Sequence, residues 1–385
     1  MPRATHEVAD VIRLFGDALL RQETVSPARQ RVMRAILACR TSQLGGHVES
    51  CDSCDYQRIA YNSCRNRHCP KCQGSRQAQW LEDRAEDLLP VEYFHVVFTM
   101  PEEIAAIALQ NKRVVYGILF GASASTLRTI AADPVHLGAE IGFLSVLHTW
   151  SQDLRHHPHV HCVVPGGGLT ADGRWVACRP GFFLPVRVLG AMFRGKFVAQ
   201  LRAAYERGDL RLQGSLEPLC DPVAFAACLD QVMAKPWVVY AKPPFGGPLQ
   251  VLKYLARYTH RVAIGNRRIL DVGNDGVKFR WRDRANGDRP RTMVLPGVEF
   301  LRRFLLHVLP RGFPRIRHYG LLGNRMRAVK LATCRLLLGA PMPAPAGVQL
   351  EPVTHSPERC PSCKVGQLVR LRLTVLTEPE VRDSS

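Results

Sequence analysis

Apolar residues in the first forty positions recur every three or four residues, which is the spacing of an amphipathic helix. The pattern predicts one helix over residues 7–20 and a second over residues 27–38. Pro27 opens the second helix, where a residue without an N–H costs no hydrogen bond. Residues 74–89 repeat the helical spacing, so we expect the N-terminal part of the chain to be mainly helical.

From Val91 onward, short runs of β-branched and aromatic residues are mixed with longer helical stretches. The short runs predict strands at residues 93–100, 141–150, 159–165, 237–240, 268–272 and 277–282. The helical stretches predict helices at residues 102–131, in one or two pieces, and at 186–207, 221–234 and 249–259. Because strands and helices do not alternate regularly, the pattern favours an α+β fold with an antiparallel sheet.

Composition narrows the class of partner. Hydrophobic residues make up 46% of the 385 positions and charged residues 22%, which is typical of a folded protein. The formal charge is +19, and residues 253–335 hold twenty Lys and Arg against five Asp and Glu. A folded basic face of this size predicts an anionic partner, first of all nucleic acid. No apolar run approaches the roughly 18 residues that would cross a bilayer, so we expect no membrane partner.

Thirteen cysteines are unevenly distributed, and the N-terminus shows no secretory signal. Cys51 and Cys54, followed by Cys69 and Cys72, form two Cys-x-x-Cys units, which in a reducing compartment are typical of zinc sites. Four sulfurs complete a tetrahedron around zinc and leave no open position, so this zinc would be structural.

Other cysteines and histidines leave a second site open. Cys39, His47, Cys64 and His68 offer two thiols and two imidazoles, a set that also satisfies zinc. Near the C-terminus, Cys360 and Cys363 form only half of such a site; His355 could add a ligand, no fourth ligand is evident, and a structural or vestigial role without zinc is the alternative. Five prolines between residues 341 and 357 predict a linker or tail in front of this pair.

The segment from His156 to Cys162 is unusually rich in histidine. If residues 159–165 form a strand, alternation places His159 and His161 on one face. Two imidazoles on one strand face can bind a single divalent cation, although a pair with ordinary hydrogen bonds is the alternative. A third metal ligand would be needed, and the sequence leaves three candidates open: His148, Gln152 and His157.

Tyr254 and Tyr258 lie four residues apart in a predicted helix and therefore share one face. Lys253, Arg257 and Arg261 form a basic stripe beside them. Such a helix can present two phenols to a nucleic-acid backbone while the cations bind phosphates. The alternative, which is commoner for any such pair, is that both tyrosines pack in the core.

Taken together, these motifs resemble the two-tyrosine HUH rolling-circle transposases of bacterial insertion sequences, the insertion-sequence family ninety-one group. The resemblance rests on SCRNRHCPKCQG (63–74), LHTWSQDLRHHPHVHCVVPGGG (147–168) and YLARYTHRVAI (254–264). It implies an HUH endonuclease fold, an antiparallel sheet flanked by helices. The implied domains are a helical and zinc-binding DNA-binding domain (1–90), an HUH-type catalytic transposase domain (91–335) and a Pro-rich linker with a short Cys-x-x-Cys tail (336–385).

The resemblance also implies a chemistry. His159 and His161 would hold Mg²⁺ or Mn²⁺, which acts as a Lewis acid on the scissile phosphate of single-stranded DNA. Tyr254 and Tyr258 would be the nucleophiles, each able to form a 5′-phosphotyrosine. The DNA partners would be the element ends and the target, and the enzyme would act in the bacterial cytoplasm, associated with the nucleoid.

Two other functions stay open at this point. A zinc-dependent DNA- or RNA-binding regulator without catalysis would explain the charge and the cysteines, but it would leave the histidine strand and the tyrosine helix without a role. A metal-dependent nuclease that uses water would need the histidines and no tyrosine. Covalent trapping on labelled single-stranded DNA separates these possibilities.

Overall fold

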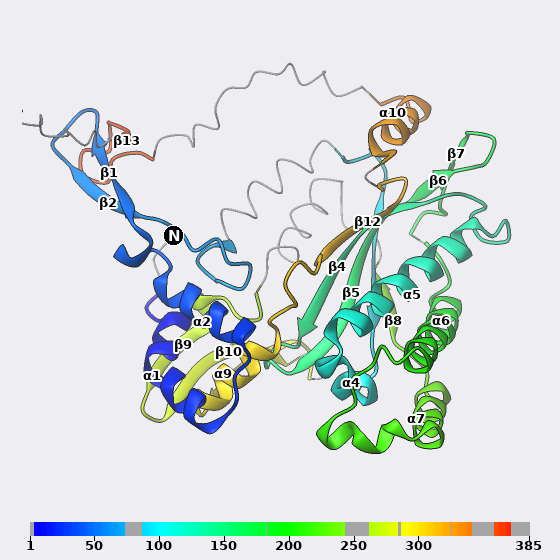
Figure 1. The fold of residues 1–385 in the computed structure, drawn as a ribbon. Coiled ribbons are helices and arrows are strands. Elements are labelled where there is room, and N and C mark those ends of the chain that lie inside the picture. The colour runs from blue at the N-terminus through cyan, green and yellow to red at the C-terminus, as the bar shows by residue number, and fades with distance from the viewer. Residues whose placement is uncertain are drawn as a thin grey trace, which may run out of the picture.

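The computed structural model describes residues 4–73, 87–181, 183–242, 262–283, 286–323, 325–340 and 358–370. Within these residues the chain forms a central sheet with helices, a smaller α/β unit beside it, and a projecting β arm (Figure 1). The predicted helix at 249–259 lies outside the described residues, and so does most of the one at 74–89.

Five antiparallel strands form the central sheet, in the order β12-β4-β5-β3-β8. Their bounds are β3 Tyr93–Thr99, β4 Gly142–Trp150, β5 His156–Pro165, β8 Val239–Lys242 and β12 Ile316–Gly320. The consecutive strands β4 and β5 pair near the middle of the sheet, joined by a short turn. The sheet confirms the predicted α+β fold. The histidine strand begins three residues earlier than its predicted start at residue 159.

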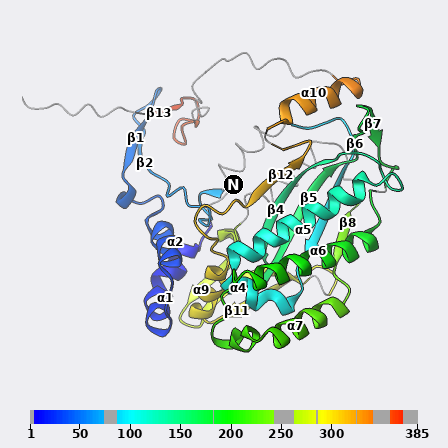
Figure 2. The ribbon, with the colours of Figure 1, turned by 45° about the vertical axis from the view of Figure 1, so that its right-hand side comes forward.

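Helices cover one face of this sheet (Figure 2). They are α4 Ala105–Gln110, α5 Lys112–Ala132, α6 Val186–Glu206 and α7 Pro222–Ala234. Val160 and Cys162 of β5 enter the core between sheet and helices. Helix α5 is long and apolar enough to cross a membrane. However, 67% of its most apolar 18-residue stretch is buried inside the protein, so α5 is a core helix here.

The predicted helix at 102–131 is interrupted at Asn111, between α4 and α5. The Asn111 side-chain amide donates hydrogen bonds to the carbonyl oxygens of Ile107 (3.0 Å) and Arg211 (2.9 Å). Its carbonyl oxygen accepts from the Arg211 backbone N–H (2.7 Å). The side chain thus satisfies backbone groups at the break, so a polar residue can be buried there.

The smaller unit combines the N-terminal helices with a segment from the last third of the chain around one core. Its elements are α1 Val8–Gln22, α2 Pro27–Ala38, β9 Ile269–Gly273, β10 Gly276–Asp283, β11 Arg289–Leu295 and α9 Gly297–Leu306. Ile12 of α1, Phe279 of β10 and Phe300 of α9 belong to the same buried cluster. The predicted boundary at residue 90 did not anticipate this shared core, and the three-domain division stays a prediction.

The arm is a three-stranded antiparallel sheet in which the tail returns to the N-terminal region. Its strands are β1 Gly46–Cys51, β2 Gln57–Tyr61 and β13 Leu368–Arg370, with β1 in the middle. The described residues also form the hairpin of β6 Gly167–Leu169 and β7 Trp175–Ala177, and helix α10 Arg327–Leu337. Cys51 lies opposite Leu368 in the β1–β13 register, so residues far apart in the sequence form one sheet.

Candidate active site and metal centres

Three histidines meet on the face of the central sheet opposite the helices. His148 comes from β4, and His159 and His161 come from β5. One ligand nitrogen from each lies within 4.8 Å of the others. All three side chains are buried, with 3%, 8% and 5% of their surface exposed. The structure thus brings the two predicted metal ligands together with one of the three candidates for the third.

Strand register explains why this candidate is His148. His159 and His161 share a face because residues two apart on a strand point the same way. His148 lies directly opposite His159 in the β4–β5 pair, and cross-strand neighbours also share a face. His157 is exposed, and it contributes its carbonyl oxygen to His159. The backbone carbonyl oxygen of Gln152 accepts a hydrogen bond from the Arg268 side chain.

Hydrogen bonds orient two of the imidazoles. His159 Nδ1 donates to the His157 carbonyl oxygen (2.7 Å), because that oxygen can only accept. Its Nε2 is therefore the nitrogen with a lone pair for a metal. His161 Nδ1 is 2.8 Å from His95 Nε2, and the two rings stack with centroids 5.0 Å apart. Such bonds to the second ring nitrogen fix the orientation of metal-binding histidines.

His95 on β3 was missed in the sequence. The sequence pattern could have revealed it. Alternation along Tyr93–Thr99 and the β3–β5 pairing place His95 on the same face as His159 and His161. Trp150 lies next to His148, at the opposite edge of the histidine cluster from His95. Its ring stacks on His148 with centroids 4.7 Å apart, and the Arg315 guanidinium lies 5.5 Å from its centroid.

The donor set fits a divalent cation. Three buried imidazoles converge, and three adjacent imidazolium charges would repel each other at these distances. Neutral imidazoles, in contrast, are common ligands of divalent transition metals, whereas Mg²⁺ prefers oxygen. The site can therefore hold a metal ion with open positions for substrate oxygen atoms.

The other predicted catalytic residues cannot be placed. Tyr254, Tyr258, Lys253, Arg257 and Arg261 all lie outside the described residues. Their assignment stays a prediction.

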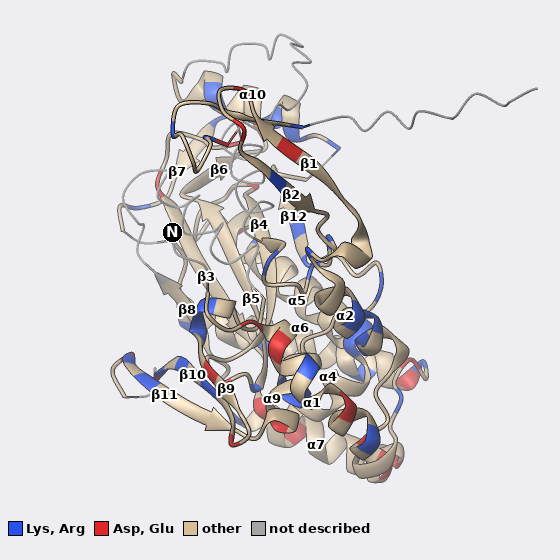
Figure 3. Cartoon of the chain, turned by 90° about the vertical axis from the view of Figure 1, so that its left-hand side faces the viewer, with Lys and Arg blue, Asp and Glu red and all other residues tan. Residues whose placement is uncertain are grey.

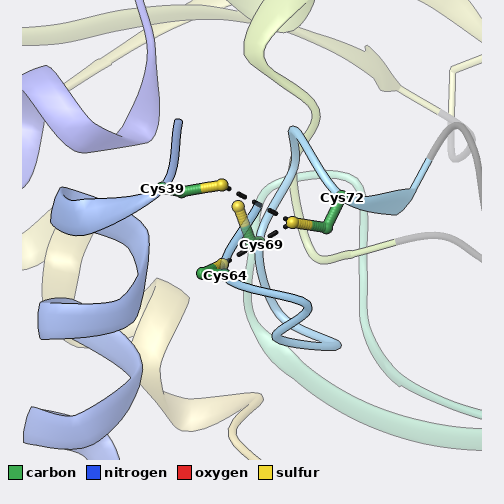
Figure 4. Close-up of side chains that lie close together, drawn as sticks. All are labelled: Cys39, Cys64, Cys69 and Cys72. Carbon is green, nitrogen blue, oxygen red and sulfur yellow. Dashed lines mark hydrogen bonds between the residues drawn. The ribbon is translucent and has the colours of Figure 1, made fainter. Parts of the chain in front are cut away.

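Four cysteines form a buried cluster beside α2 (Figure 4): Cys39, Cys64, Cys69 and Cys72. Cys72 Sγ is 3.5 Å from Cys39 Sγ and 3.6 Å from Cys64 Sγ. Cys39 follows the last turn of α2, and the other three come from the loop after β2. Cys39, Cys69 and Cys72 belong to the core that α1, α9 and β10 share. This cluster fits a structural zinc inside that core.

The predicted grouping of the cysteines was wrong. Cys51 and Cys54 do not join Cys69 and Cys72, as their spacing had suggested. They lie at the end of β1, with Cys51 Sγ 3.7 Å from Cys363 Sγ and Cys54 Sγ 3.7 Å from Cys360 Sγ. The tail supplies the other half of that cluster because β13 pairs with β1.

The second predicted set, with His47 and His68, is also corrected. His47 Nε2 bonds to Glu49 Oε1 (3.2 Å) on the arm. His68 Nε2 accepts a hydrogen bond from the Leu309 backbone N–H (3.4 Å), and burial lowers the His68 pKa to about 3. Both histidines therefore make hydrogen bonds within the fold, while Cys39 and Cys64 pair with Cys69 and Cys72.

The sulfur atoms of the first cluster affect one another's ionisation. Hydrogen bonding from Cys69 lowers the pKa of the Cys64 thiol to about 5, and the same bond raises the pKa of Cys69. One thiolate surrounded by neighbouring thiols attracts a cation, since zinc binds the deprotonated form.

A basic stripe lies on β10. Lys278, Arg280 and Arg282 are exposed and alternate with residues that face inward, and Figure 3 shows basic residues along β10 and β11. Arg282 pairs with Asp288 (2.9 Å). The stripe belongs to the basic run, residues 253–335, that the sequence predicted as a nucleic-acid-binding face.

Comparison with known proteins identifies the family. The model of a family described as "Putative transposase" matches residues 142–330, and the model of the transposase zinc-binding domain of the IS91 type matches residues 11–100. The "Putative transposase y4qJ" of Sinorhizobium fredii is 56% identical over 97% of this chain and 96% of its own length. The transposase of insertion sequence element IS801 from Pseudomonas savastanoi pv. phaseolicola is 27% identical over 77% of this chain and 73% of its own length.

Among solved structures, the conjugative relaxase TrwC in complex with its OriT DNA matches 65% of this chain and 73% of its own. The sequence identity is 15% and the TM-score is 0.25, which is too low to support an argument. The family models and the sequence relatives are all described as transposases, and the model that matches the N-terminal part is a zinc-binding domain. The chain belongs to the IS91 family of transposases.

Proposed function

We propose that this transposase nicks and rejoins single-stranded DNA through a 5′-phosphotyrosine, in rolling-circle transposition. The observation that carries the proposal is the convergence of His148, His159 and His161 from two adjacent strands. A divalent cation bound there would polarise the scissile phosphate. The N-terminal zinc would be structural, and the enzyme would work on the bacterial nucleoid at the element ends and the target.

The protein residues would divide the remaining work. The His157 carbonyl and His95 hold two of the metal-binding imidazoles in position. Tyr254 and Tyr258 would supply the nucleophile. A phenol oxygen forms the bond to phosphorus, the bond to the 3′ oxygen breaks, and the phenol proton ends on that leaving oxygen. One phosphodiester replaces another, so no external energy source is required.

Two tyrosines one helical turn apart would allow a second strand transfer while the first adduct persists. An unperturbed phenol has a pKa of about 10, so the nucleophile needs a nearby cation or base. Arg257 and Arg261 flank Tyr258 in the sequence. We therefore expect Tyr258 to act first.

The competing functions lack a use for the histidine cluster or for the tyrosines. A regulator that only binds nucleic acid needs neither buried convergent imidazoles nor a hydrogen-bonded His95 behind them. A nuclease that uses water would employ the histidines, and it would leave no protein attached to DNA.

Covalent trapping tests the proposal. The wild-type chain should form an adduct with labelled single-stranded DNA from the element ends, and mass spectrometry should place the 5′ nucleotide on Tyr254 or Tyr258. The Tyr254→Phe and Tyr258→Phe variants should each impair transposition, and the double variant should form no adduct.

Tyr240→Phe is a matched control. Tyr240 is half exposed on β8, and in the sheet register it shares a face with His161 through Val97. This variant should keep wild-type adduct formation. Efficient cleavage by the double Phe variant, or an adduct on a serine or on Tyr240, would move the chemistry to another residue.

A further inference from the structure

The second cysteine cluster is assembled from two distant parts of the chain. Cys51 and Cys54 belong to the N-terminal arm, and Cys360 and Cys363 belong to the tail. The zinc-binding family match ends at residue 100, so it contains only half of these ligands. None of these cysteines belongs to the histidine cluster.

We propose that these four cysteines bind a second structural zinc ion, which fastens the C-terminal tail to the N-terminal arm. In a tetrahedral site of four thiolates the Zn–S distance is about 2.3 Å, which places the sulfurs about 3.8 Å apart. The two S–S distances across the cluster, one from each arm cysteine to a tail cysteine, are both 3.7 Å. All four sulfurs lie within 4.8 Å of one another.

The backbone around the sulfurs has the form of two facing metal knuckles. On the arm, the Ser53 backbone N–H points to Cys51 Sγ (3.3 Å). On the tail, the Gly366 N–H points to Cys363 Sγ (3.3 Å). N–H groups directed at sulfur favour the thiolate, which is the form that binds zinc.

A left-handed residue ends the cysteine turn of the tail. Lys364 directly follows Cys363 and has φ 59°, with its N–H bonded to the Cys360 carbonyl (3.0 Å). In the first cluster, Arg40 after Cys39 and Arg65 after Cys64 have φ 58° and 51°. Non-glycine residues adopt this conformation at a cost, so its recurrence after cysteines of both clusters indicates the same local geometry.

The two knuckles fit closely against each other. A Cβ on Gly366 would lie 2.5 Å from Cys51 Sγ, so no larger residue fits there without a shift. Asp52 Oδ1 accepts a hydrogen bond from the Gln367 backbone N–H (2.8 Å), and Arg58 pairs with Glu358. These contacts place the tail cysteines opposite the arm cysteines.

The apolar core of the arm is too small to hold the tail by itself. Its buried members are Cys51, Cys360 and Leu368, with half-buried Cys54, Tyr56 and Cys363 around them. Small β-units of this kind depend on a metal or a disulfide for stability, and metal binding then supplies the folding free energy. Attachment of residues 358–370 should therefore depend on zinc.

Elemental analysis of the full chain gives the first test. The purified wild type should contain two zinc ions per chain, and Cys360→Ser/Cys363→Ser should contain one. Cys220→Ser/Cys228→Ser changes two cysteines outside both clusters and should keep two. A wild type with a single zinc, or a tail variant that keeps both ions, would overturn the proposal.

Release of the tail gives a second test that does not depend on stoichiometry. A protease site is introduced between residues 341 and 357 of the full chain, and the cut protein is analysed by gel filtration. The tail should stay bound and should dissociate when a chelator removes zinc. In the Cys51→Ser/Cys54→Ser variant the cut tail should dissociate without a chelator. The variant should still contain one zinc ion, the one in the first cluster. A tail that leaves the zinc-loaded wild type, or that stays after both ions are removed, would contradict zinc-dependent attachment.

Discussion

The ring of His161 lies among the imidazoles of three other histidines. Nδ1 is 2.8 Å from His95, and the ring also contacts His148 and His159 with centroids 4.4 and 4.8 Å apart. The residue is 5% exposed, so solvent does not screen these contacts. We therefore expect substitution at this position or at His159 to weaken metal binding at the histidine cluster.

We expect His159→Ala and His161→Ala each to abolish nicking of single-stranded DNA and to leave DNA affinity largely unchanged. Affinity comes mainly from cations that contact phosphates, whereas the imidazoles act on one phosphate. Nicking on a labelled strand and fluorescence anisotropy measure the two properties separately.

EDTA should stop wild-type nicking, and Mn²⁺ or Mg²⁺ should restore it. His136→Ala, at an exposed histidine in the turn after α5 that is not part of the cluster, should behave as wild type. Wild-type nicking by both alanine variants would show that the histidines are not metal ligands.

His95 should act through His161. We expect His95→Gln to weaken metal binding by about 10- to 100-fold, as loss of an outer hydrogen bond does at other metal sites. Calorimetric titration with Mn²⁺ measures the affinity directly. Nicking by the variant should recover at saturating Mn²⁺, a rescue that a merely misfolded variant would not show. Unchanged Mn²⁺ affinity would assign His95 to packing alone.

Residue-level prediction succeeded where the determining pattern was local. Alternation along one strand was sufficient to pair His159 with His161. The third ligand depended on the register between two strands, which includes an irregularity between His148 and Trp150 that no local pattern reveals. The spacing of the cysteines predicted the wrong grouping, because the partners of Cys51 and Cys54 are cysteines near the C-terminal end of the chain.

At the scale of elements, α1 and α9 are in close contact at Gly297. A Cβ on Gly297 would overlap the ring of Phe15, so only glycine fits this position. Close approach of two helices is one of the situations that require a glycine. The contact holds the N-terminal helix against the unit that carries the basic strand β10.

We expect Gly297→Ala to lower the free energy of unfolding by about 1–3 kcal/mol, the usual cost of an overpacked site. Urea denaturation followed by circular dichroism measures the change. Gly195→Ala is the control, since a Cβ there meets nothing within 4 Å on α6. It should be neutral or stabilise by about 0.5–1 kcal/mol, because alanine is the better helix former. Equal effects of the two substitutions would contradict the proposed contact.

Prediction of elements was best for the body of the central domain. Strong periodicity located α5, α6, α7 and the strands β3, β4 and β5. The edge strand β12 and helix α9 were not predicted, although α9 places Phe300 and Phe304 in the core. The half-buried Ile316–Gly320 lacks a clear alternation, so only pairing with β4 makes it a strand. In the arm, β1 and β2 pair with each other, and the short tail strand β13 is a strand through its pairing with β1.

Across the whole molecule, the turn between β4 and β5 connects the histidine site with the smaller unit. Buried His307, which follows α9, donates from Nε2 to the Leu154 carbonyl (3.0 Å) and accepts at Nδ1 from Thr149 (3.2 Å). Burial lowers its pKa to about 3, which keeps the ring neutral. Leu154 itself enters the core that holds the first cysteine cluster. These contacts connect the basic strand and the first cysteine cluster with the strands that carry the histidines.

This arrangement predicts that the exposed cations of β10 set the salt dependence of DNA binding. Lys278→Ala/Arg280→Ala should weaken binding of single strands of any sequence. The slope of log K against log salt concentration should fall by about 0.7 for each phosphate that the protein no longer neutralises. Arg187→Ala/Arg202→Ala removes the same charge from exposed positions on α6, a helix on the opposite side of the central sheet from the histidines. If both double variants change the slope equally, net charge and not the β10 face determines binding. If only the β10 variant changes it, the DNA follows the basic strand, and the shared core then determines which phosphate reaches the histidines.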